Sequence, residues 1–149
     1  MTTAAPDYRR PESVLVVIFT GVGDVLLLKR RRPFEFWQSV TGSLQYGESR
    51  AAAAKRELRE ETGLTDQGEL ISTGSSRQFT IDSRWRNRFA PGVVENVEYE
   101  YRYKMQERVE ISLSEDEHSE LLWLPIAEAA SRVWSWTNKQ AIDQLKVAS

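Results

Sequence analysis

The sequence contains no cysteine, which excludes disulfide bonds, thiolate metal ligands and cysteine nucleophiles. It also lacks a surplus of positive charge. The net charge is -2, whereas domains that bind nucleic acid usually carry a basic excess that neutralises phosphates. The 149 residues include no repeat, no low-complexity tract and no apolar run long enough to span a membrane. We therefore expect a cytoplasmic protein with no nucleic-acid, membrane or obligate protein partner.

Composition is that of one globular domain covering residues 1–149, with 40% hydrophobic and 28% charged residues. The first dozen residues are polar and contain two prolines, so they resemble neither a signal peptide nor a membrane span. We expect residues 1–10 to form a flexible tail.

The first half of the chain predicts a hairpin followed by a helix. Two apolar runs, Val14 to Phe19 and Val25 to Leu28, flank a glycine-rich turn and indicate paired strands. A short strand is expected over Phe36 to Val40. The spacing of alanines and leucine from Ser49 to Thr62 predicts a helix, and Gly63 suits the left-handed position just after it.

The second half predicts two strands and two helices. From Val97 to Met105, apolar and charged residues alternate, which is typical of a half-buried antiparallel strand. Leu121 to Leu124 indicates a short strand, and Pro125 can begin a helix that extends through Trp134. Thr137 and Gln140 have capping-box spacing before a last helix that reaches about Ala148. The fold class expected is α+β, with a mixed β-sheet sandwiched between α-helices.

Three glutamates of the helix predicted first fall within one narrow arc of its surface: Glu57, Glu60 and Glu61. Clustered like charges call for a compensating cation, and Mg2+ or Mn2+ prefers carboxylate oxygens. The alternative is an ordinary solvated helix face. A loop with glycine at Gly42 and Gly47 directly precedes the helix, where the backbone can approach a ligand, and this favours the metal site.

These residues can be matched to a family. Gly42, five residues, Glu48, seven residues and then the stretch Arg56 to Leu64 resemble the complete signature of the Nudix hydrolases. The resemblance implies the Nudix fold and an enzyme that hydrolyses phosphoanhydride bonds. It implies that Glu57, Glu60 and Glu61 hold Mg2+, with Mn2+ as a substitute, helped by the Gly42 carbonyl. Arg56 and Glu48 would orient the loop and helix without touching the substrate.

Hydrolysis also requires a group that takes a proton from the attacking water. The candidates are Glu61, within the signature, and Glu117, outside it. Glu117, from a loop before the last strand, would also reach the metal. Its alternative role is as part of the acidic turn Glu115-Asp116-Glu117.

Beyond the signature, the chain resembles the Nudix subfamily that cleaves dihydroneopterin triphosphate in bacterial folate biosynthesis. Four segments carry this resemblance: Phe36 to Ser43, Ala90 to Val93, Glu117-His118 and Ser135 to Ile142. The implied products are dihydroneopterin monophosphate and pyrophosphate. Two alternatives stay open: a dATP or deoxynucleoside triphosphate pyrophosphohydrolase, and a Nudix-fold module that binds a nucleotide without cleaving it.

A flat pterin needs stacking surface and fixed polar partners. Besides Phe36, the candidates are Trp37, Trp136 and Asn138, although packing in the core is the alternative for any tryptophan, especially Trp123 and Trp134.

Basic residues near the end of the second predicted strand are candidates for the phosphates. Lys29 and Arg30, with Arg31 beside them, are the candidates to contact the triphosphate. The alternative is that they form a solvated, basic strand end. His118, the only histidine, is too isolated to argue for a metal site, and a structural hydrogen-bonding role is the alternative. Two departures from the subfamily pattern, Val94-Glu95 and Lys139, affect possible substrate contacts.

Overall fold

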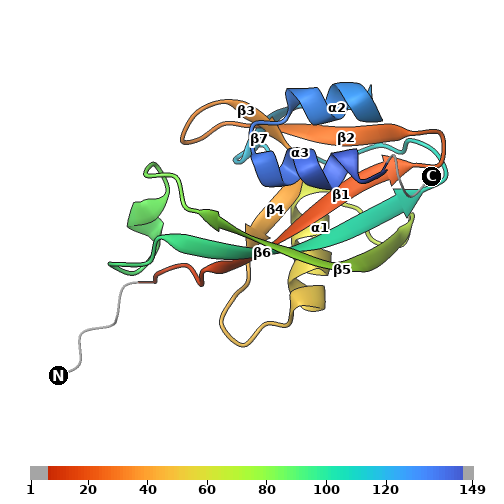
Figure 1. Ribbon diagram of the computed structural model, residues 1–149. Helices are drawn as coiled ribbons and strands as arrows, with labels where there is room; N and C mark the ends of the chain where they lie inside the picture. The colour runs from red at the N-terminus through yellow and green to blue at the C-terminus, as the bar shows by residue number, and fades with distance from the viewer. Residues whose placement is uncertain (1–6, 146–149) are drawn as a thin grey trace.

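The computed structural model describes residues 7–145 as a mixed sheet with helices on both faces (Figure 1). The elements are β1 (Glu12–Thr20), β2 (Asp24–Arg30), β3 (Phe36–Gln38), β4 (Val40–Ser43), α1 (Arg50–Thr62), β5 (Glu69–Thr80), a short 3-10 helix η1 (Arg86–Arg88), β6 (Glu95–Met105), β7 (His118–Pro125), α2 (Ile126–Arg132) and α3 (Trp136–Asp143). None of the helices in this part of the chain has the length and apolar character needed to cross a membrane.

The seven-stranded sheet contains both parallel and antiparallel pairs. Its main path has the order β3-β2-β1-β6-β5, while β4 pairs with β1 and β7 pairs with β2. Strand β6 runs parallel to β1 and antiparallel to β5. The predicted hairpin of β1 and β2 is confirmed. The two strands share one pair of facing residues, Phe19 and Val25, because β1 pairs mainly with β4 and β6 and β2 pairs mainly with β7.

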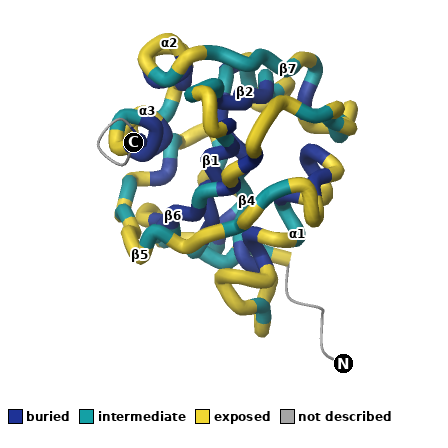
Figure 2. The backbone as a smooth tube through the Cα atoms, turned by 90° about the vertical axis from the view of Figure 1, so that its right-hand side faces the viewer, coloured by how far each residue is buried: buried dark blue, intermediate teal, exposed yellow. Residues whose placement is uncertain are grey.

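The two faces of the sheet bury separate apolar clusters. One contains Val14, Val16 and Leu58 and lies under α1, whereas the other contains Leu15 and Val17 and lies under α2 and α3. Alternate residues of β1 thus point to opposite helical layers. Figure 2 shows β1 as a buried strand at the centre of the molecule. The predicted α+β class, a mixed sheet between helices, is confirmed.

Local sequence explains where α1 begins and ends. The Ser49 hydroxyl accepts a hydrogen bond from the Ala52 amide at 3.1 Å, which caps the first turn. At the other end Gly63 has a φ of 77°, and its amide donates to the Arg59 carbonyl at 2.8 Å. The predicted helix from Ser49 to Thr62 is therefore confirmed within a residue.

Strand β6 differs from the prediction of a half-buried antiparallel strand. Glu98 and Glu100, expected in solvent, are 6% and 1% exposed. The opposite face, with Tyr101 and Tyr103, is buried against the α1 side. The strand lies between β1 and β5 with helical layers on both sides, so neither face is fully solvated.

Three further differences concern the ends of elements. The expected strand over residues 36–40 is divided into β3 and β4 at Ser39. Helix α2 ends at Arg132 instead of Trp134. Helix α3 is capped by Ser135 instead of Thr137, because the Ser135 hydroxyl accepts from the Asn138 amide. Its expected end at Ala148 lies outside the described residues. Strand β5, a long edge strand with many polar residues, was not predicted.

Candidate active site

Arg56 is the centre of an ion-pair network that joins the loop before α1 to the acidic face of that helix. Its guanidinium donates to both oxygens of Glu48, at 2.8 and 2.9 Å, and to Glu57 at 2.7 Å. Further donor atoms reach Glu60 at 3.2 Å and the Ser43 carbonyl at 3.1 Å. The Arg56 hydrogen bonds hold the pKa of Glu48 below its usual range. Glu48 and Arg56 thus join the loop to the helix through their side chains.

Gly42 lies against the carboxyl group of Glu57. A Cβ atom added at Gly42 would collide with that carboxyl group, so the close approach of β4 and α1 requires glycine here. Burial raises the pKa of Glu57, while the hydrogen bond and the positive charge of Arg56 oppose that rise. The result is a carboxyl group clamped between strand and helix at one edge of a cavity.

Glu61 is the most buried acid of the signature, with 1% of its surface exposed. Neither of its carboxyl oxygens has a hydrogen-bond partner within the described residues. Burial, followed by the nearby carboxyl groups of Glu57 and Glu117, raises its pKa well above the usual value. A buried carboxyl group without partners indicates that a bound cation completes its environment.

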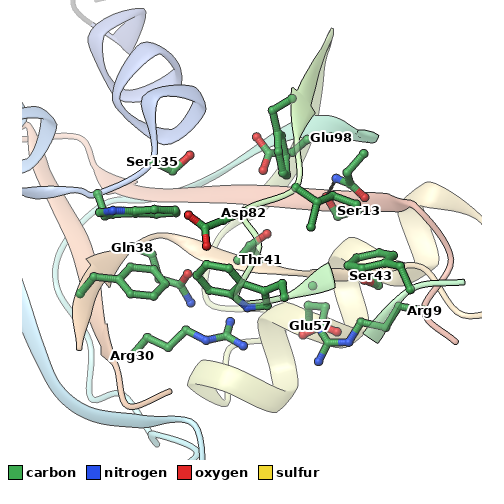
Figure 3. A pocket seen from close by; sticks show the side chains of 18 of the residues that line it. Arg9, Ser13, Arg30, Gln38, Thr41, Ser43, Glu57, Asp82, Glu98 and Ser135 are labelled. Atoms are coloured by element: carbon green, nitrogen blue, oxygen red, sulfur yellow. Dashed lines mark hydrogen bonds between the residues drawn. The ribbon is translucent and has the colours of Figure 1, made fainter. Parts of the chain in front are cut away.

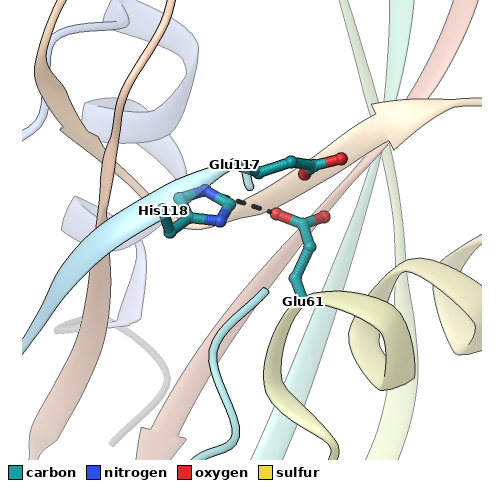
Figure 4. Close-up of side chains that lie close together, drawn as sticks. All are labelled: Glu61, Glu117 and His118. Carbon is teal, nitrogen blue, oxygen red and sulfur yellow. Dashed lines mark ion pairs between the residues drawn. The ribbon is translucent and has the colours of Figure 1, made fainter. Parts of the chain in front are cut away.

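Glu117 and His118 approach Glu61 from the start of β7 (Figure 4). One potential ligand atom from each of the three residues lies within 4.8 Å of the others. His118 Nε2 is 3.6 Å from the Glu61 carboxyl and 3.1 Å from Gln38 Nε2. Burial, and secondarily Arg30, lowers the pKa of His118 to about 4, so the imidazole is neutral at pH 7. Hard carboxylate oxygens with a neutral histidine fit a divalent cation.

Glu60 differs from the other two signature acids. Its side chain is 52% exposed and pairs with Arg56. It lies on the same arc of α1 but not in the tight group formed by Glu61, Glu117 and His118. The predicted acidic cluster therefore consists of a buried part and a solvent-facing part.

A cavity of about 570 Å³ opens beside these acids. Gly42, Glu57 and Glu117 line it, and Figure 3 shows Arg9, Arg30 and Glu57 together at one end. Burial lowers the pKa of both arginines, each of which lies near the other and near Glu117 and Glu57. This end combines cations with acids, as a metal-bound phosphate chain requires.

Arg9 was not singled out by sequence reasoning because it belongs to the ten residues expected to form a tail. Of those, residues 1–6 lie outside the described part. The Arg9 amide donates to the Arg88 carbonyl at 2.7 Å, and Arg10 pairs with Glu12 at 2.8 Å. No local motif marks Arg9, since its place in the cavity depends on the distant η1 segment.

Aromatic side chains form one wall of the cavity. Phe36, Trp85 and Trp134 come from three separate segments, and their ring centroids lie 5.3 to 5.8 Å apart. Trp134 is 46% exposed, so the alternative that it packs in the core does not hold. Trp136 also lines the cavity and is 56% exposed. These rings offer the flat apolar surface on which a heterocycle stacks.

Three residues predicted to bind substrate do not line the cavity. Lys29 pairs with Glu35 and Glu120 on the surface. Trp37 packs against the apolar cluster under α2 and α3. The Asn138 side chain is occupied by Ser39, whose amide donates to it at 2.8 Å and whose hydroxyl accepts from it at 2.9 Å.

The side chain of Asn138 thus contacts another part of the fold and does not face the cavity lining. Of the five predicted substrate-binding residues, Arg30 and Trp136 line the cavity.

Two polar residues of β6 were missed. Asn96 and Glu98 line the cavity, and both are buried. Burial raises the pKa of Glu98 to about 7. Their position two residues apart on a strand was visible in the sequence, but the alternating pattern suggested that this face was solvated.

Comparison with known proteins shows that the likeness covers nearly the whole chain. Residues 9–145 match the model of the NUDIX domain. The chain is 40% identical over 144 residues to the dihydroneopterin triphosphate diphosphatase of Escherichia coli strain K12, which covers 94% of this chain and 95% of the relative. It is 32% identical over 139 residues to the protein of the same name from Haemophilus influenzae, over 91% and 87% of the two chains.

The fold is also similar to that of a solved structure over nearly the whole chain. The structure of the E. coli dihydroneopterin triphosphate pyrophosphohydrolase superposes with a TM-score of 0.88 at 39% identity and covers 95% of this chain and 99% of that one.

Proposed function

The chain belongs to the NUDIX family and is a Nudix hydrolase, and from this premise we propose that it converts dihydroneopterin triphosphate to dihydroneopterin monophosphate and pyrophosphate. One observation carries the proposal. The acidic centre of α1 opens into a cavity that is also lined by two arginines, by aromatic stacking surface and by buried polar groups. The relatives at 40% and 32% identity carry this substrate in their names.

We propose Mg2+ as the cation, with Mn2+ as a substitute, because the available donors are mainly hard carboxylate oxygens. Glu57, Glu61 and Glu117 would hold it, with Glu60 at the solvent side and the Gly42 carbonyl beside Glu57. When bound, the cation neutralises charge on the phosphoanhydride and favours attack by water. Arg56 keeps Glu57 in place and Glu48 fixes Arg56, so both are positioning residues.

Arg9 and Arg30 bind the phosphate chain in this proposal. Both line the acidic end of the cavity, and no carboxylate pairs with their guanidinium groups among the described ion pairs. A guanidinium donates two parallel hydrogen bonds to a phosphate, which orients the chain for hydrolysis. Trp136 and the aromatic wall hold the ring by stacking.

Glu117 is the group that we propose to accept the proton of the attacking water. It lines the cavity and is exposed, so water reaches it directly, whereas Glu61 is buried. Glu117→Gln should lower kcat by a factor on the order of 100 or more with little change in KM. An unchanged kcat would exclude this role and leave Glu61 as the proton acceptor.

The rival substrate is dATP, whose purine resembles a pterin in size. Hydrolysis of dihydroneopterin triphosphate, dGTP and dATP should be compared with and without Mg2+, with pyrophosphate release as the signal. The proposal expects the highest kcat/KM for dihydroneopterin triphosphate. A higher value for dATP would reject it in favour of nucleotide-pool cleaning, and absence of turnover on all three would favour a binding module. The cytoplasmic location and the place in folate biosynthesis stay predictions.

A further inference from the structure

The end of the cavity formed by β6 carries two buried oxygen atoms without hydrogen-bond partners among the described residues. They are Oε1 of Glu98 and Oδ1 of Asn96. The residues are 6% and 3% exposed, and both line the cavity. Leaving a buried polar atom without a partner costs on the order of 1–3 kcal/mol. Two such atoms at one cavity wall indicate that a ligand supplies their donors.

Asn96 is held by a hydrogen bond to a neighbouring strand. Its side-chain amide nitrogen donates to the Ser13 hydroxyl of β1 at 2.8 Å, which leaves its oxygen as the atom without a partner. Asn96 and Glu98 are two residues apart on β6, so both side chains extend from the same face. That face thus presents two hydrogen-bond acceptors close together at one end of the cavity.

Two adjacent acceptors suit a ring that presents two adjacent N–H donors. A 2-amino-4-oxopyrimidine ring, as in pterins and guanine, has a ring N–H next to its amino group, and a carboxylate accepts from both. Adenine instead presents an acceptor nitrogen beside its amino group, which would face the carboxylate lone pairs. Adenine therefore leaves one of the two groups unpaired.

We infer that Glu98, with Asn96 beside it, binds the N–H edge of a 2-amino-4-oxopyrimidine ring and so determines the preference of the enzyme for such rings over adenine. The inference rests on the proposed function, because the proposed substrate contains this ring. The inference adds the identity of the residues that bind the edge of the ring and distinguish it from adenine.

The arrangement of the cavity agrees with this role. Figure 3 shows Glu98 on the side of the cavity opposite Arg30 and Glu57, so a ring beside Glu98 extends its phosphate chain toward the other two residues. Burial raises the pKa of Glu98 to about 7, while a hydrogen bond from Thr137 and the charge of Arg77 favour its ionised form. Two donors from a bound ring stabilise that form further.

The test is the substrate preference of Glu98→Gln, which replaces one acceptor with a donor and keeps the shape. With Mg2+, kcat/KM for dihydroneopterin triphosphate and dGTP should fall at least about tenfold, because an N–H now faces an N–H. For dATP the value should change less than about threefold, since the new amide can donate to the adenine acceptor. A general loss of folding would lower all three values together.

Glu100→Gln is the matched control. Glu100 is also buried on β6, but it pairs with Arg77 at 2.7 Å and does not line the cavity. Its substitution should leave the ratio between the three substrates unchanged. Inhibition of the wild-type enzyme by neopterin and by adenosine gives a second measurement that needs no variant. Neopterin should bind at least about tenfold more tightly.

The outcomes separate the two claims. If the wild-type enzyme prefers dATP to dihydroneopterin triphosphate, the proposed substrate is rejected. If Glu98→Gln leaves the ratio of dGTP to dATP hydrolysis unchanged while the protein stays folded, the role of Glu98 is overturned, whichever substrate is preferred. Equal inhibition by neopterin and adenosine would overturn it as well.

Discussion

Arg56 is the residue on which the placement of the acids most depends. Its planar guanidinium bonds simultaneously to Glu48, Glu57 and the Ser43 carbonyl. A lysine has the same charge but a single nitrogen, so it cannot maintain these contacts together. Arg56→Lys should therefore lower kcat/KM about 10- to 100-fold and raise the Mg2+ concentration needed for half-maximal rate.

The measurement is the Mg2+ dependence of initial rates. Arg59→Lys provides the control, because it replaces arginine with lysine at an exposed position on the same helix. If Arg56→Lys loses thermal stability but needs no more Mg2+ than the wild type, Arg56 supports the fold and does not position the acids.

Glu98 predicts a pH effect on stability. Its pKa in the folded protein is about 7, above the usual 4.5, so the folded state retains a proton that the unfolded chain releases between these values. The corresponding stabilisation is complete below about pH 4.5 and is lost as the pH rises through about 7. Relative to wild type, Glu98→Gln should thus gain stability between about pH 5 and pH 8, by ~3 kcal/mol at most.

Denaturant unfolding of both proteins over this pH range measures the difference. Arg77 and Glu100 are the charged neighbours of Glu98, with opposite effects on its ionisation, and both are unchanged in the variant. Glu95 is an exposed glutamate on the same strand, so the stability of Glu95→Gln should change with pH in the same way as that of wild type. If the free energy of unfolding of Glu98→Gln changes with pH in the same way as that of wild type, Glu98 ionises normally in the folded protein.

At the scale of elements, α3 is tied to the break between β3 and β4. Asn138 satisfies both the amide and the hydroxyl of Ser39 in a buried position. Asn138→Ala leaves that amide without a partner and should lower the free energy of unfolding by ~1–3 kcal/mol. Because Asn138 does not line the cavity, KM should stay unchanged.

Lys139→Ala is the appropriate comparison, since its exposed ion pair with Asp143 on the same helix contributes little. Thermal unfolding and steady-state kinetics together decide the matter. A raised KM without loss of stability in Asn138→Ala would show that this side chain binds substrate after all.

The elements also show what local sequence can predict. Helix α1 was predictable because its cap, its apolar spacing and its terminal glycine lie within 15 residues of one another. The faces of β6 were not, because a strand enclosed by β1 and β5 is buried by residues far away in the chain. The cap of α3 was misplaced by two residues because Ser135 and Thr137 are equally suitable as caps from sequence.

At the scale of the whole molecule, the site also contains residues that local sequence predicts and residues that only the folded chain brings together. The residues from Gly42 to Glu61 were predictable because the signature is nearly contiguous. Arg9, Asn96 and Glu98 join it only when the start of the chain, β6 and the η1 segment come together around one cavity. Residue type alone does not indicate such positions, since each is common on protein surfaces.

The cation centre couples the active site to the stability of the whole domain. Glu61 is buried without a hydrogen-bond partner among the described residues, so the cation-free protein bears the cost of an uncompensated acid. A cation that binds only the folded state offsets this cost, by ~2.7 kcal/mol at a concentration 100 times its Kd. Mg2+ should therefore raise Tm, and EDTA should reverse the rise.

Glu61→Gln tests the coupling, because the amide is neutral and a poorer ligand for a hard cation. Without Mg2+ this variant should be at least as stable as wild type, and adding Mg2+ should no longer raise its Tm. Glu107→Gln, an exposed glutamate outside the site, should respond as wild type does. If Mg2+ raises the Tm of Glu61→Gln as much as that of wild type, the cation binds without Glu61. The buried acid would then be a cost to the fold that no metal offsets.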